Sequence, residues 1–421
     1  MDRTNFRKTV IIFGAIHAVI FLGVLPTVAH FLYPGTGGLE NFLAQLMRGG
    51  QIPYHDFASE YPPLALFSFL LPGLVTSNTA VYSWLFAGEM MVFDLLALII
   101  IADLASRLKM SVKNTLTVYT LLIVATGPIL VARYDVLPAA LVLAALWAFV
   151  KGKNKLAWAV AALGFAAKIY PIIILPIFVI YQMKNRQYGR MMTGGAVFLG
   201  VTLITILPWI IIDAGGYWHS WTYHLERGLH SESTYGTTLL TGQLMGLTTM
   251  QGALTFGSWN LSSPLADSLA RMSFYISAAI LLVVYGFYAW RLQRESENPR
   301  VGLSESAAAQ LLKYATIVVA VFMLTNKVFS AQYLAWLCPL IPLAADRRYF
   351  APMLFIAAGV LTQYVYPYNY IPFELGKALP VLVLTFRNLL LILMTVLIAA
   401  AGRDRDSLYQ TNGTRALRSG G

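Results

Sequence analysis

The sequence predicts an all-α integral membrane protein that crosses the lipid bilayer with about 12 helices. Hydrophobic residues make up 58% of the 421 residues and charged residues only 12%, whereas a soluble domain carries about 25% charged residues. The mean hydropathy of +0.65 leaves too little polar surface for a water-soluble fold. Apolar stretches of about 20 residues, the length that a spanning helix needs, recur along the whole chain.

The first apolar stretch, 9–31, follows several positive charges, as the core of a signal peptide does. It is too long for a signal peptide and many similar stretches follow it, so we expect an uncleaved first span. Further spanning helices are expected at 79–105, 113–130, 136–151, 191–212, 269–290, 307–325, 331–345, 350–366 and 379–401.

Two ambiguous stretches decide the orientation. The stretch 62–76 is short and contains Pro72, so we expect it to lie in the membrane interface or to dip into the membrane without crossing it. The stretch 155–183 is broken at Tyr170-Pro171 and is expected as two short spans, because Pro disrupts a helix and disfavours helical geometry in the residue before it. Both termini are then cytoplasmic, and about 22 of the 30 Lys and Arg residues face the cytoplasm, as the positive-inside rule requires.

This topology gives a membrane domain, 1–402, and a cytoplasmic charged tail, 403–421. The membrane domain has two large outer loops, 32–61 and 213–268. The net charge of +11 is explained by Lys and Arg in short cytoplasmic loops, so no nucleic-acid partner is expected. Cys338 is the single cysteine, which excludes an intrachain disulfide.

Ionisable side chains from about five separate segments collect on the outer face of the predicted bundle, and such groups are costly in lipid unless they face a polar cavity or a partner. We therefore expect one outward-facing cavity lined by carboxylates and cations. For any single residue, ordinary loop charge or snorkelling remains an alternative. The residues concerned are Asp56, Glu60, Arg133, Asp135, Lys168, His224, Glu226, Arg227, His230, Glu232, Lys327, Gln332, Tyr333, Glu374, Lys377 and Arg387.

Two further groups of polar residues give weaker signals. His219, His224 and His230 lack the tight spacing of metal ligands, so we expect solvated loop residues. Glu89 and Asp94 lie inside the predicted span 79–105. They either line a cavity or pair with Arg387 or another polar neighbour.

Five stretches carry a resemblance to a known family: PYHDFASEYPP at 53–63, RYDVLPAALVLAAL at 133–146, LGFAAKIYPIIILP at 163–176, YHLERGLHSES at 223–233 and NKVFSAQYLAW at 326–336. With a long, carboxylate-bearing first outer loop, they resemble the GT-C superfamily of membrane glycosyltransferases. The closer resemblance is to glycosyltransferase family 87, the polyprenol-phosphate-mannose-dependent mannosyltransferases. It covers most of residues 30–340.

The resemblance implies a GT-C-like fold in the cell membrane with an active site on the extracytoplasmic side. It also implies a hexosyltransferase that moves mannose from a polyprenyl-phosphate donor to a glycolipid or glycan acceptor. Family members tend to carry an Asp early in the first outer loop as the expected catalytic base. Residues 33–40 here read YPGTGGLE, without Asp. Either Asp56 is the base, with Glu60 and Glu40 as alternatives, or the activity differs.

Physical chemistry fits a lipid-linked donor. A phosphate monoester, with a second pKa of about 6, is already a good leaving group, so no general acid is needed. One carboxylate that takes the acceptor proton contributes about 10²–10⁴-fold to the rate, and cations stabilise the departing phosphate. We expect inversion at the anomeric carbon and neither metal nor cofactor.

Within this scheme we expect Lys168, Arg227 and Lys327 to hold the lipid phosphate, with Arg133 as a further cation. Further residues are expected to orient sugar hydroxyls or the loop, or to complete the substrate-binding set: Asp135, Glu232, Gln332 and Tyr333. The outer tyrosines Tyr54, Tyr61 and Tyr134 either stack on sugar faces or belong to an interfacial aromatic belt.

Two other functions compete with sugar transfer. A secondary transporter or lipid flippase often has inverted repeats with broken helices and binding groups at the bilayer midplane. This chain shows one broken hairpin and no counterpart in its second half. A non-catalytic envelope scaffold is the other alternative, and it predicts that Asp56, Glu60 and Lys168 all tolerate replacement by Ala.

Overall fold

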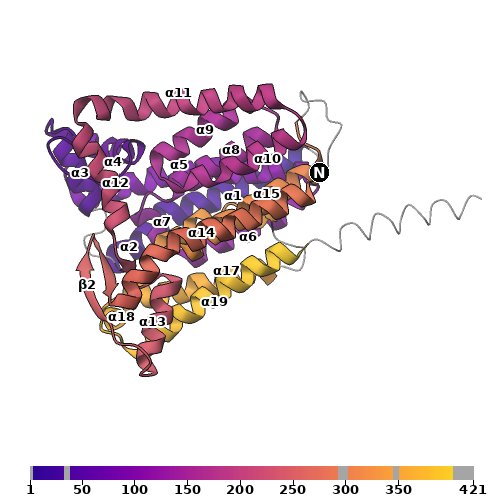
Figure 1. Cartoon of the computed structure of the whole chain (residues 1–421). Coiled ribbons are helices and arrows are strands. Elements are labelled where there is room, and N and C mark those ends of the chain that lie inside the picture. The colour runs from indigo at the N-terminus through magenta and orange to yellow at the C-terminus, as the bar shows by residue number, and fades with distance from the viewer. Residues whose placement is uncertain (1–2, 33–37, 293–301, 345–349, 402–421) are drawn as a thin grey trace, which may run out of the picture.

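The structure is a computed structural model that describes residues 3–32, 38–292, 302–344 and 350–401, and it is an all-α bundle (Figure 1). The predicted tail 403–421 and part of the first outer loop, 33–37, lie outside these residues. In the described chain, seven helices are long and apolar enough to cross a membrane. They are the continuous first helix, formed by α1 (Arg3–Val19), the π-helix η1 (Ile20–Val24) and α2 (Leu25–Leu32), then α5 (Thr79–Arg107), α11 (Tyr188–Ile212), α14 (Pro264–Arg291), α15 (Glu305–Thr325), α17 (Phe350–Gln363) with η4 (Tyr364–Tyr368), and α19 (Ala378–Ala400).

Shorter apolar helices lie between these spans: α4 (Pro63–Val75), α6 (Val112–Thr126), α8 (Val136–Val150), and η2 (Tyr170–Ile174) with α10 (Leu175–Lys184). The expected helix at 113–130 is shorter than predicted. It ends at Thr126 because Gly127 takes a positive φ of 76° and Pro128 follows, a combination that stops a helix. The other helices are α3 (Gly38–Arg48), α7 (Ile129–Ala132), α9 (Asn154–Ala167), α12 (Ala214–Glu226), α13 (Thr234–Leu244), η3 (Ala331–Trp336), α16 (Ile341–Ala344) and α18 (Tyr370–Glu374).

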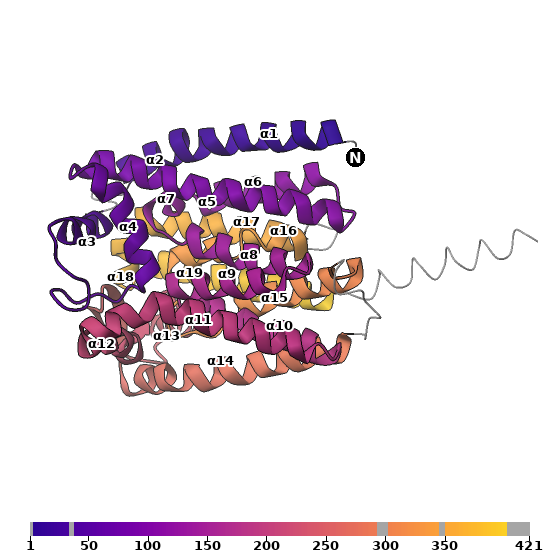
Figure 2. The same ribbon diagram turned by 90° about the horizontal axis from the view of Figure 1, so that it is seen from above.

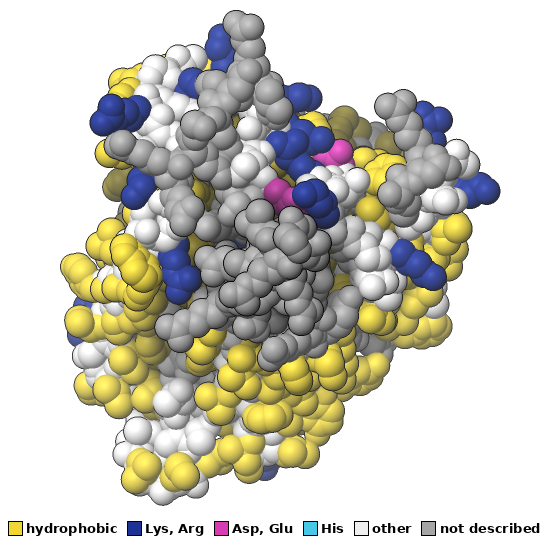
Figure 3. Space-filling view, turned by 90° about the vertical axis from the view of Figure 1, so that its right-hand side faces the viewer, with side chains coloured by type: hydrophobic (Ala, Val, Ile, Leu, Met, Phe, Trp, Pro, Cys, Tyr) yellow, Lys and Arg dark blue, Asp and Glu magenta, His cyan; other side chains and the backbone are white. Residues whose placement is uncertain are grey.

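The bundle has two distinct ends. At one of them, which we call the loop end, α3, α4, α12, α13 and α18 gather with the small sheet (Figures 1 and 2). The N-terminus and the last turn of α19 lie at the opposite, terminal end. Figure 3 looks onto the terminal end, where Lys and Arg side chains stand out among hydrophobic ones. The helix α4 lies at the loop end beside α3, as expected for a segment that does not cross the membrane.

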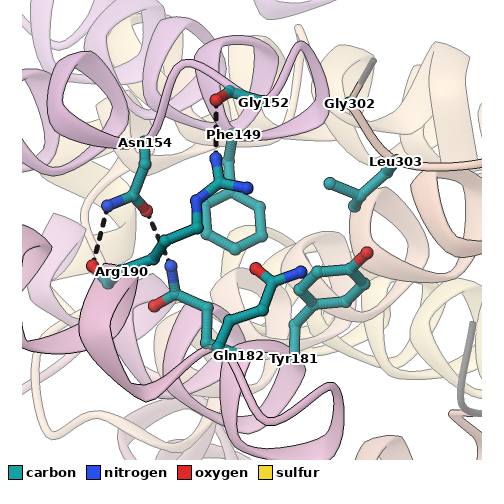
Figure 4. A pocket seen from close by; sticks show the side chains of 9 residues that line it. Phe149, Gly152, Asn154, Tyr181, Gln182, Arg190, Gly302 and Leu303 are labelled. Carbon is teal, nitrogen blue, oxygen red and sulfur yellow. Dashed lines mark hydrogen bonds between the residues drawn. The ribbon is translucent and has the colours of Figure 1, made fainter. Parts of the chain in front are cut away.

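The predicted broken hairpin at 155–183 is confirmed. The helix α9 ends at Ala167, Lys168 is extended (φ −161°, ψ 150°), and a 3-10 turn that includes Pro171 leads into α10. The far ends of the two halves meet near the terminal end, where Gln182 Nε2 donates to Asn154 Oδ1 at 2.6 Å. Figure 4 shows this junction, in which Arg190 of the next helix also donates to the Gly152 carbonyl at 2.7 Å.

The prediction of one continuous helix at 331–345 is wrong. The segment forms the 3-10 helix η3, a turn, and the four-residue α16. Pro339 and Pro342 explain the difference, because each removes a backbone donor and clashes with the preceding turn of an α-helix. The irregular segment is buried among α5, α6, α15 and α17, and this burial shields its backbone from lipid.

A three-stranded antiparallel sheet closes the loop end. Its order is β1 (Leu229–His230), β3 (Ser258–Ser262) and β2 (Gln251–Thr255), so β3 is central. His230 pairs with Asn260, and Ala253 pairs with the same Asn260 from the other side. The sheet therefore links the hairpin β2–β3 to the loop that follows β1.

A polar network joins the first helix to α5 and α6 within the bundle. His17 Nδ1 lies 2.7 Å from Asp94 Oδ2, the Tyr119 hydroxyl donates to Asp94 Oδ1 at 2.7 Å, and His17 Nε2 lies 2.9 Å from Thr120 Oγ1. His17 and Asp94 are fully buried. Of the two roles left open for Asp94, the structure therefore supports pairing with polar neighbours. Glu89 accepts a hydrogen bond from Ser68 at 2.7 Å in the same way.

We expect His17→Leu to destabilise the protein by about 1–3 kcal/mol, because Asp94 loses one buried hydrogen-bond partner. Thermal unfolding in lipid nanodiscs measures the effect as a lower melting temperature. His30→Leu is the matched control, since His30 is exposed on the same first helix. Equal melting temperatures for the two variants would contradict the structural role of the network.

Candidate active site

The candidate site lies at the loop end, where breaks between helices deliver its side chains. Glu40 lies on α3 and Glu60 just before α4, Arg133 and Asp135 lie between α7 and α8, and Lys168 lies in the break of the hairpin. The remaining side chains of the site, Arg227, Glu232 and Lys327, lie in the segments that follow α12, β1 and α15. Extended residues recur in these breaks: Arg133 (φ −138°, ψ 153°) ends α7 as Lys168 ends α9.

Glu40 and Arg133 form a close ion pair. Arg133 Nη1 donates to Glu40 Oε1 at 2.7 Å, with the Glu40 side chain fully buried and that of Arg133 about one-third exposed. The carboxylate raises the pKa of Arg133, so this guanidinium stays charged. Glu40 Oε2 is buried and has no hydrogen-bond partner among the described residues, which leaves one oxygen for a further donor.

Lys168 lies in an aromatic cage closed by a carboxylate. Its ammonium is 2.6 Å from Asp135 Oδ1 and about 5 Å from the ring centres of Tyr134, Tyr333 and Trp336. Trp336 Nε1 donates to the same Asp135 oxygen at 2.6 Å, and its ring stacks on that of Tyr333 at 4.0 Å. Trp336 is a site residue that the sequence reasoning missed, although its motif NKVFSAQYLAW carries part of the family resemblance. Gln332 is half-buried on the same η3.

Arg227 and Lys327 are cations without a carboxylate partner in the described part of the chain. Arg227 Nε is buried and makes no hydrogen bond there. Lys327 Nζ donates to the Leu225 carbonyl at 2.8 Å. Burial and the neighbouring Arg227 lower the pKa of Lys327, so the two positive charges act on one another. Such a pair of cations suits an anionic ligand.

Glu60 lines a pocket and interacts electrostatically with Arg227 and Arg133. Burial raises the pKa of Glu60 above its usual range, opposed in part by Arg227 and Arg133. The Glu60 carbonyl accepts a hydrogen bond from His224 Nε2 at 3.0 Å, which holds the loop against α12. The pocket measures about 330 Å³ with its open mouth and is largely apolar. Its lining is Glu60, Pro62, Pro63, Phe165, Ala166, Ile169, Ile206, Tyr217, Ser220, Trp221 and His224.

The structure does not bring Asp56 into this cluster. Its side chain is 40% exposed, and Asp56 Oδ2 accepts a hydrogen bond from the backbone amide of Ile52 at 2.7 Å. Its neighbour His55 connects the loop to Asp213 at 3.3 Å. Asp56 therefore shapes the outer loop, while Glu40 pairs with Arg133 and Glu60 lines the pocket.

Glu232 lies in a second buried polar group next to α19. Its backbone carbonyl accepts from Arg387 Nη2 at 3.1 Å, and its carboxylate is 3.7 Å from His230 Nε2. Burial raises the pKa of Glu232 to about 7, with Arg387 opposing the shift. Burial and Arg227 lower the pKa of His230 to about 3, so His230 is neutral. The expectation that His230 is a solvated loop residue is wrong, because the strand β1 carries it into the interior.

The ionisable side chains of the candidate site described above comprise five cations and four carboxylates. The cations are Arg133, Lys168, Arg227, Lys327 and Arg387, and the carboxylates are Glu40, Glu60, Asp135 and Glu232. The pKa of Glu232, raised to about 7 by burial, lowers the negative charge of this set near neutral pH. Among the described residues, no group of three or more His, Cys, Asp and Glu side chains could hold a metal ion.

These features define a multi-pass α-helical membrane protein with a cationic, carboxylate-bearing site at one end. The chain belongs to glycosyltransferase family 87, whose model matches residues 60–318. Among solved structures it is similar to ArnT from Cupriavidus metallidurans bound to undecaprenyl phosphate, with a TM-score of 0.51 and 13% sequence identity. That match covers 92% of this chain and 76% of ArnT. The comparison with curated proteins gives no match.

The comparisons confirm the GT-C-like membrane fold and the family, so the protein is a membrane glycosyltransferase. The matched region includes Glu60, Arg133, Lys168, Arg227 and Glu232. Glu40 and Asp56 precede it, and the segment from Lys327 to Tyr333 follows it.

Proposed function

We propose that the protein transfers mannose from a polyprenyl-phosphate donor to a hydroxyl of a glycolipid or glycan acceptor on the extracytoplasmic side, with inversion. The observation that supports this most is that Glu60 lines the apolar pocket and interacts electrostatically with Arg227, whose Nε is buried without a hydrogen bond in the described chain. A carboxylate and a cation in one site meet the two needs of the reaction. The carboxylate takes the proton of the acceptor hydroxyl, and the cation neutralises the negative charge on the leaving phosphate.

The donor's phosphate belongs with Arg227 and Lys327. Both cations lack a carboxylate partner in the described chain, and Lys168 lies nearby in its cage. The apolar pocket beside Glu60 supports a lipid-linked donor, since Phe165, Ala166 and Ile169 offer hydrocarbon contact within a few residues of Lys168. ArnT, which shares the fold, was solved with undecaprenyl phosphate.

The reaction proceeds by direct displacement at the anomeric carbon. The acceptor oxygen forms a bond to that carbon while the bond between the carbon and the phosphate oxygen breaks, and the electron pair leaves with the lipid phosphate. Glu60 takes the acceptor's proton, and Arg227 and Lys327 neutralise the charge that develops on the phosphate. Attack from the side opposite the phosphate inverts the configuration.

Glu60 is the favoured base, with Glu40 as the alternative. A base must be ionised yet not tied up in an ion pair. Glu40 is held by Arg133 at 2.7 Å, whereas Glu60 lines the pocket and forms no ion pair with a described side chain. Its raised pKa makes the ionised Glu60 carboxylate a stronger base. Asp56 is disfavoured by its exposed position and its bond to Ile52.

The loop end is proposed to face the extracytoplasmic side. Lys and Arg side chains gather at the terminal end (Figure 3), and the positive-inside rule places such a face in the cytoplasm. Donors linked to a lipid can reach an outer site, whereas nucleotide sugars stay in the cytoplasm.

A reconstituted transfer assay tests the proposal. The purified protein in nanodiscs receives radiolabelled mannosyl-phosphopolyprenol, other lipid-linked sugars or a nucleotide sugar, with a membrane extract as the source of acceptor. We expect label transfer from the lipid-linked mannose only. A folded sample that moves label from none of these lipids, but that carries the donor across a bilayer, would instead be a transporter or flippase.

We expect Arg227→Met to weaken donor use, because the lipid phosphate loses a charge-assisted partner, typically worth about 1.5–3 kcal/mol. Steady-state kinetics with varied donor should show kcat/KM for the donor falling by about 10–150-fold. Arg271→Met is the matched control, since Arg271 is exposed on α14 and donates a hydrogen bond to Ser268 of the same helix. Unchanged donor kinetics for Arg227→Met would contradict the assignment.

A further inference from the structure

The outer loop between β1 and α14 contains a long stretch without ionisable side chains. Residues 233–266 contain no Asp, Glu, Lys, Arg or His. The first outer loop, by contrast, carries Glu40, Arg48, His55, Asp56 and Glu60 within a shorter span. Charged side chains cost little in a solvated loop but are costly in a segment that contacts lipid, so their absence over this length favours lipid contact.

Exposed aliphatic side chains concentrate at the tip of this stretch. Met245, Leu247 and Leu254 are 71%, 75% and 70% exposed, and every residue of β2 is exposed. The strand β3 behind it is largely buried. The uncovered apolar face therefore belongs to the tip, 244–255, which we call the apolar tip.

Contacts with α19 place the apolar tip at the level where a span enters the membrane. Thr237 Oγ1 accepts from Asn388 Nδ2 at 2.9 Å, and Thr241 Oγ1 lies 2.9 Å from Thr385 Oγ1. The chain of α13 thus runs along α19 toward its first residue, Ala378. With a rise of about 1.5 Å per residue, Thr385 lies about 10 Å from that start, so the residues after Thr241 approach the end of the span.

The lipid-facing surface of the bundle continues into the apolar tip. Leu239 and Leu240 of α13 pack on Val381 and Leu384 of α19. Beside them Leu379, Leu382 and Leu265, on α19 and α14, are about half exposed or more, as expected for side chains that contact lipid. Along the chain, no charged residue lies between Leu240 and Leu265.

We propose that the apolar tip inserts into the outer boundary of the membrane and contacts lipid. Apolar faces of interfacial elements lie about 5–10 Å into the boundary between headgroups and acyl chains. The sheet connects the apolar tip to the candidate site, because β2 pairs with β3 and β3 pairs with His230 of β1. Glu232 lies two residues after His230 in the chain, so lipid contact at the tip anchors one wall of the site.

Site-directed fluorescence quenching tests the insertion. Leu247→Cys, and independently Leu254→Cys, carry a fluorophore in nanodiscs made of phosphatidylcholine, with nitroxide-labelled lipid or aqueous iodide as the quencher. Phe274→Cys on α14 is the lipid-facing reference, since Phe274 is 73% exposed on a span, and Ala58→Cys in the exposed first loop is the aqueous reference. Cys338 is buried, so the unsubstituted protein serves as the labelling blank.

We expect both tip positions to follow Phe274, with several-fold stronger quenching by nitroxide lipid than at Ala58. Quenching by iodide alone, as at Ala58, would overturn the proposal, and so would protection from both quenchers, which would indicate a protein partner. A double replacement, Leu247→Asp with Leu254→Asp, tests the anchoring. It should raise hydrogen–deuterium exchange in 229–233 without unfolding α14, and unchanged exchange there would refute the link to the site.

Discussion

Replacing Glu60 by glutamine is expected to reduce sugar transfer by about 10²–10⁴-fold, the usual contribution of a general base. Glutamine keeps the size and polarity of the side chain but cannot accept the acceptor's proton. The transfer assay in nanodiscs measures the loss as kcat. Because the lost step is proton removal rather than donor binding, KM for the donor should change little.

The pH dependence provides the second readout for Glu60. Burial raises its pKa, so a larger fraction is protonated and inactive at low pH than for an ordinary glutamic acid. Activity should therefore rise with pH as Glu60 ionises, and the residual activity of Glu60→Gln should lose this rise. Asp56→Asn is the control, and it should keep near-normal transfer. Loss of transfer in Glu40→Gln but not in Glu60→Gln would move the base to Glu40.

Replacing Asp135 by leucine is expected to lower stability by about 3–5 kcal/mol, because a buried cation loses its carboxylate. The Lys168 and Asp135 side chains are 17% and 2% exposed, so water cannot replace the lost partner. Trp336 Nε1 loses its acceptor at the same time. Thermal unfolding in nanodiscs should show a larger decrease in melting temperature for Asp135→Leu than for His17→Leu.

A double variant separates charge from packing at this position. Asp135→Leu with Lys168→Met removes both members of the pair and should recover part of the lost stability, since the uncompensated charge is gone. Sugar transfer should stay low in the double variant. A double variant as unstable as Asp135→Leu alone would show that packing, and not the buried charge, sets the loss.

The fold was largely predictable because its signals are local. Apolar length marks the long spans, and Pro171 marks the break at which Lys168 lies. Proline also explains the main error: the apolar content of 331–345 outweighed Pro339 and Pro342 in the prediction, although these residues prevent a continuous helix. An apolar composition indicates that a segment is buried in the bundle, but it does not determine whether the backbone of that segment is a continuous α-helix.

The site was predictable only in part, because its contacts join distant segments. The sequence indicates Lys168, Asp135 and Arg227 as polar residues near predicted helix ends. It could not show that Trp336 bonds to Asp135, since 201 positions separate them. It gave Asp56 as the base, with Glu60 and Glu40 as alternatives, and this choice stays a prediction. The turn that ties Asp56 to Ile52 and leaves Glu60 near the cations is visible only in three dimensions.

The break in the hairpin at Lys168 has a consequence for how this enzyme can diverge. Within five residues, one kinked segment presents the Lys168 ammonium group to Asp135 and presents Phe165, Ala166 and Ile169 to the apolar pocket. In the proposed reaction, a single stretch of chain therefore contacts both the phosphate and the hydrocarbon of the donor. A mutation that shifts this kink changes both contacts together. A homologue that uses a different lipid carrier is therefore expected to differ in its phosphate contacts as well.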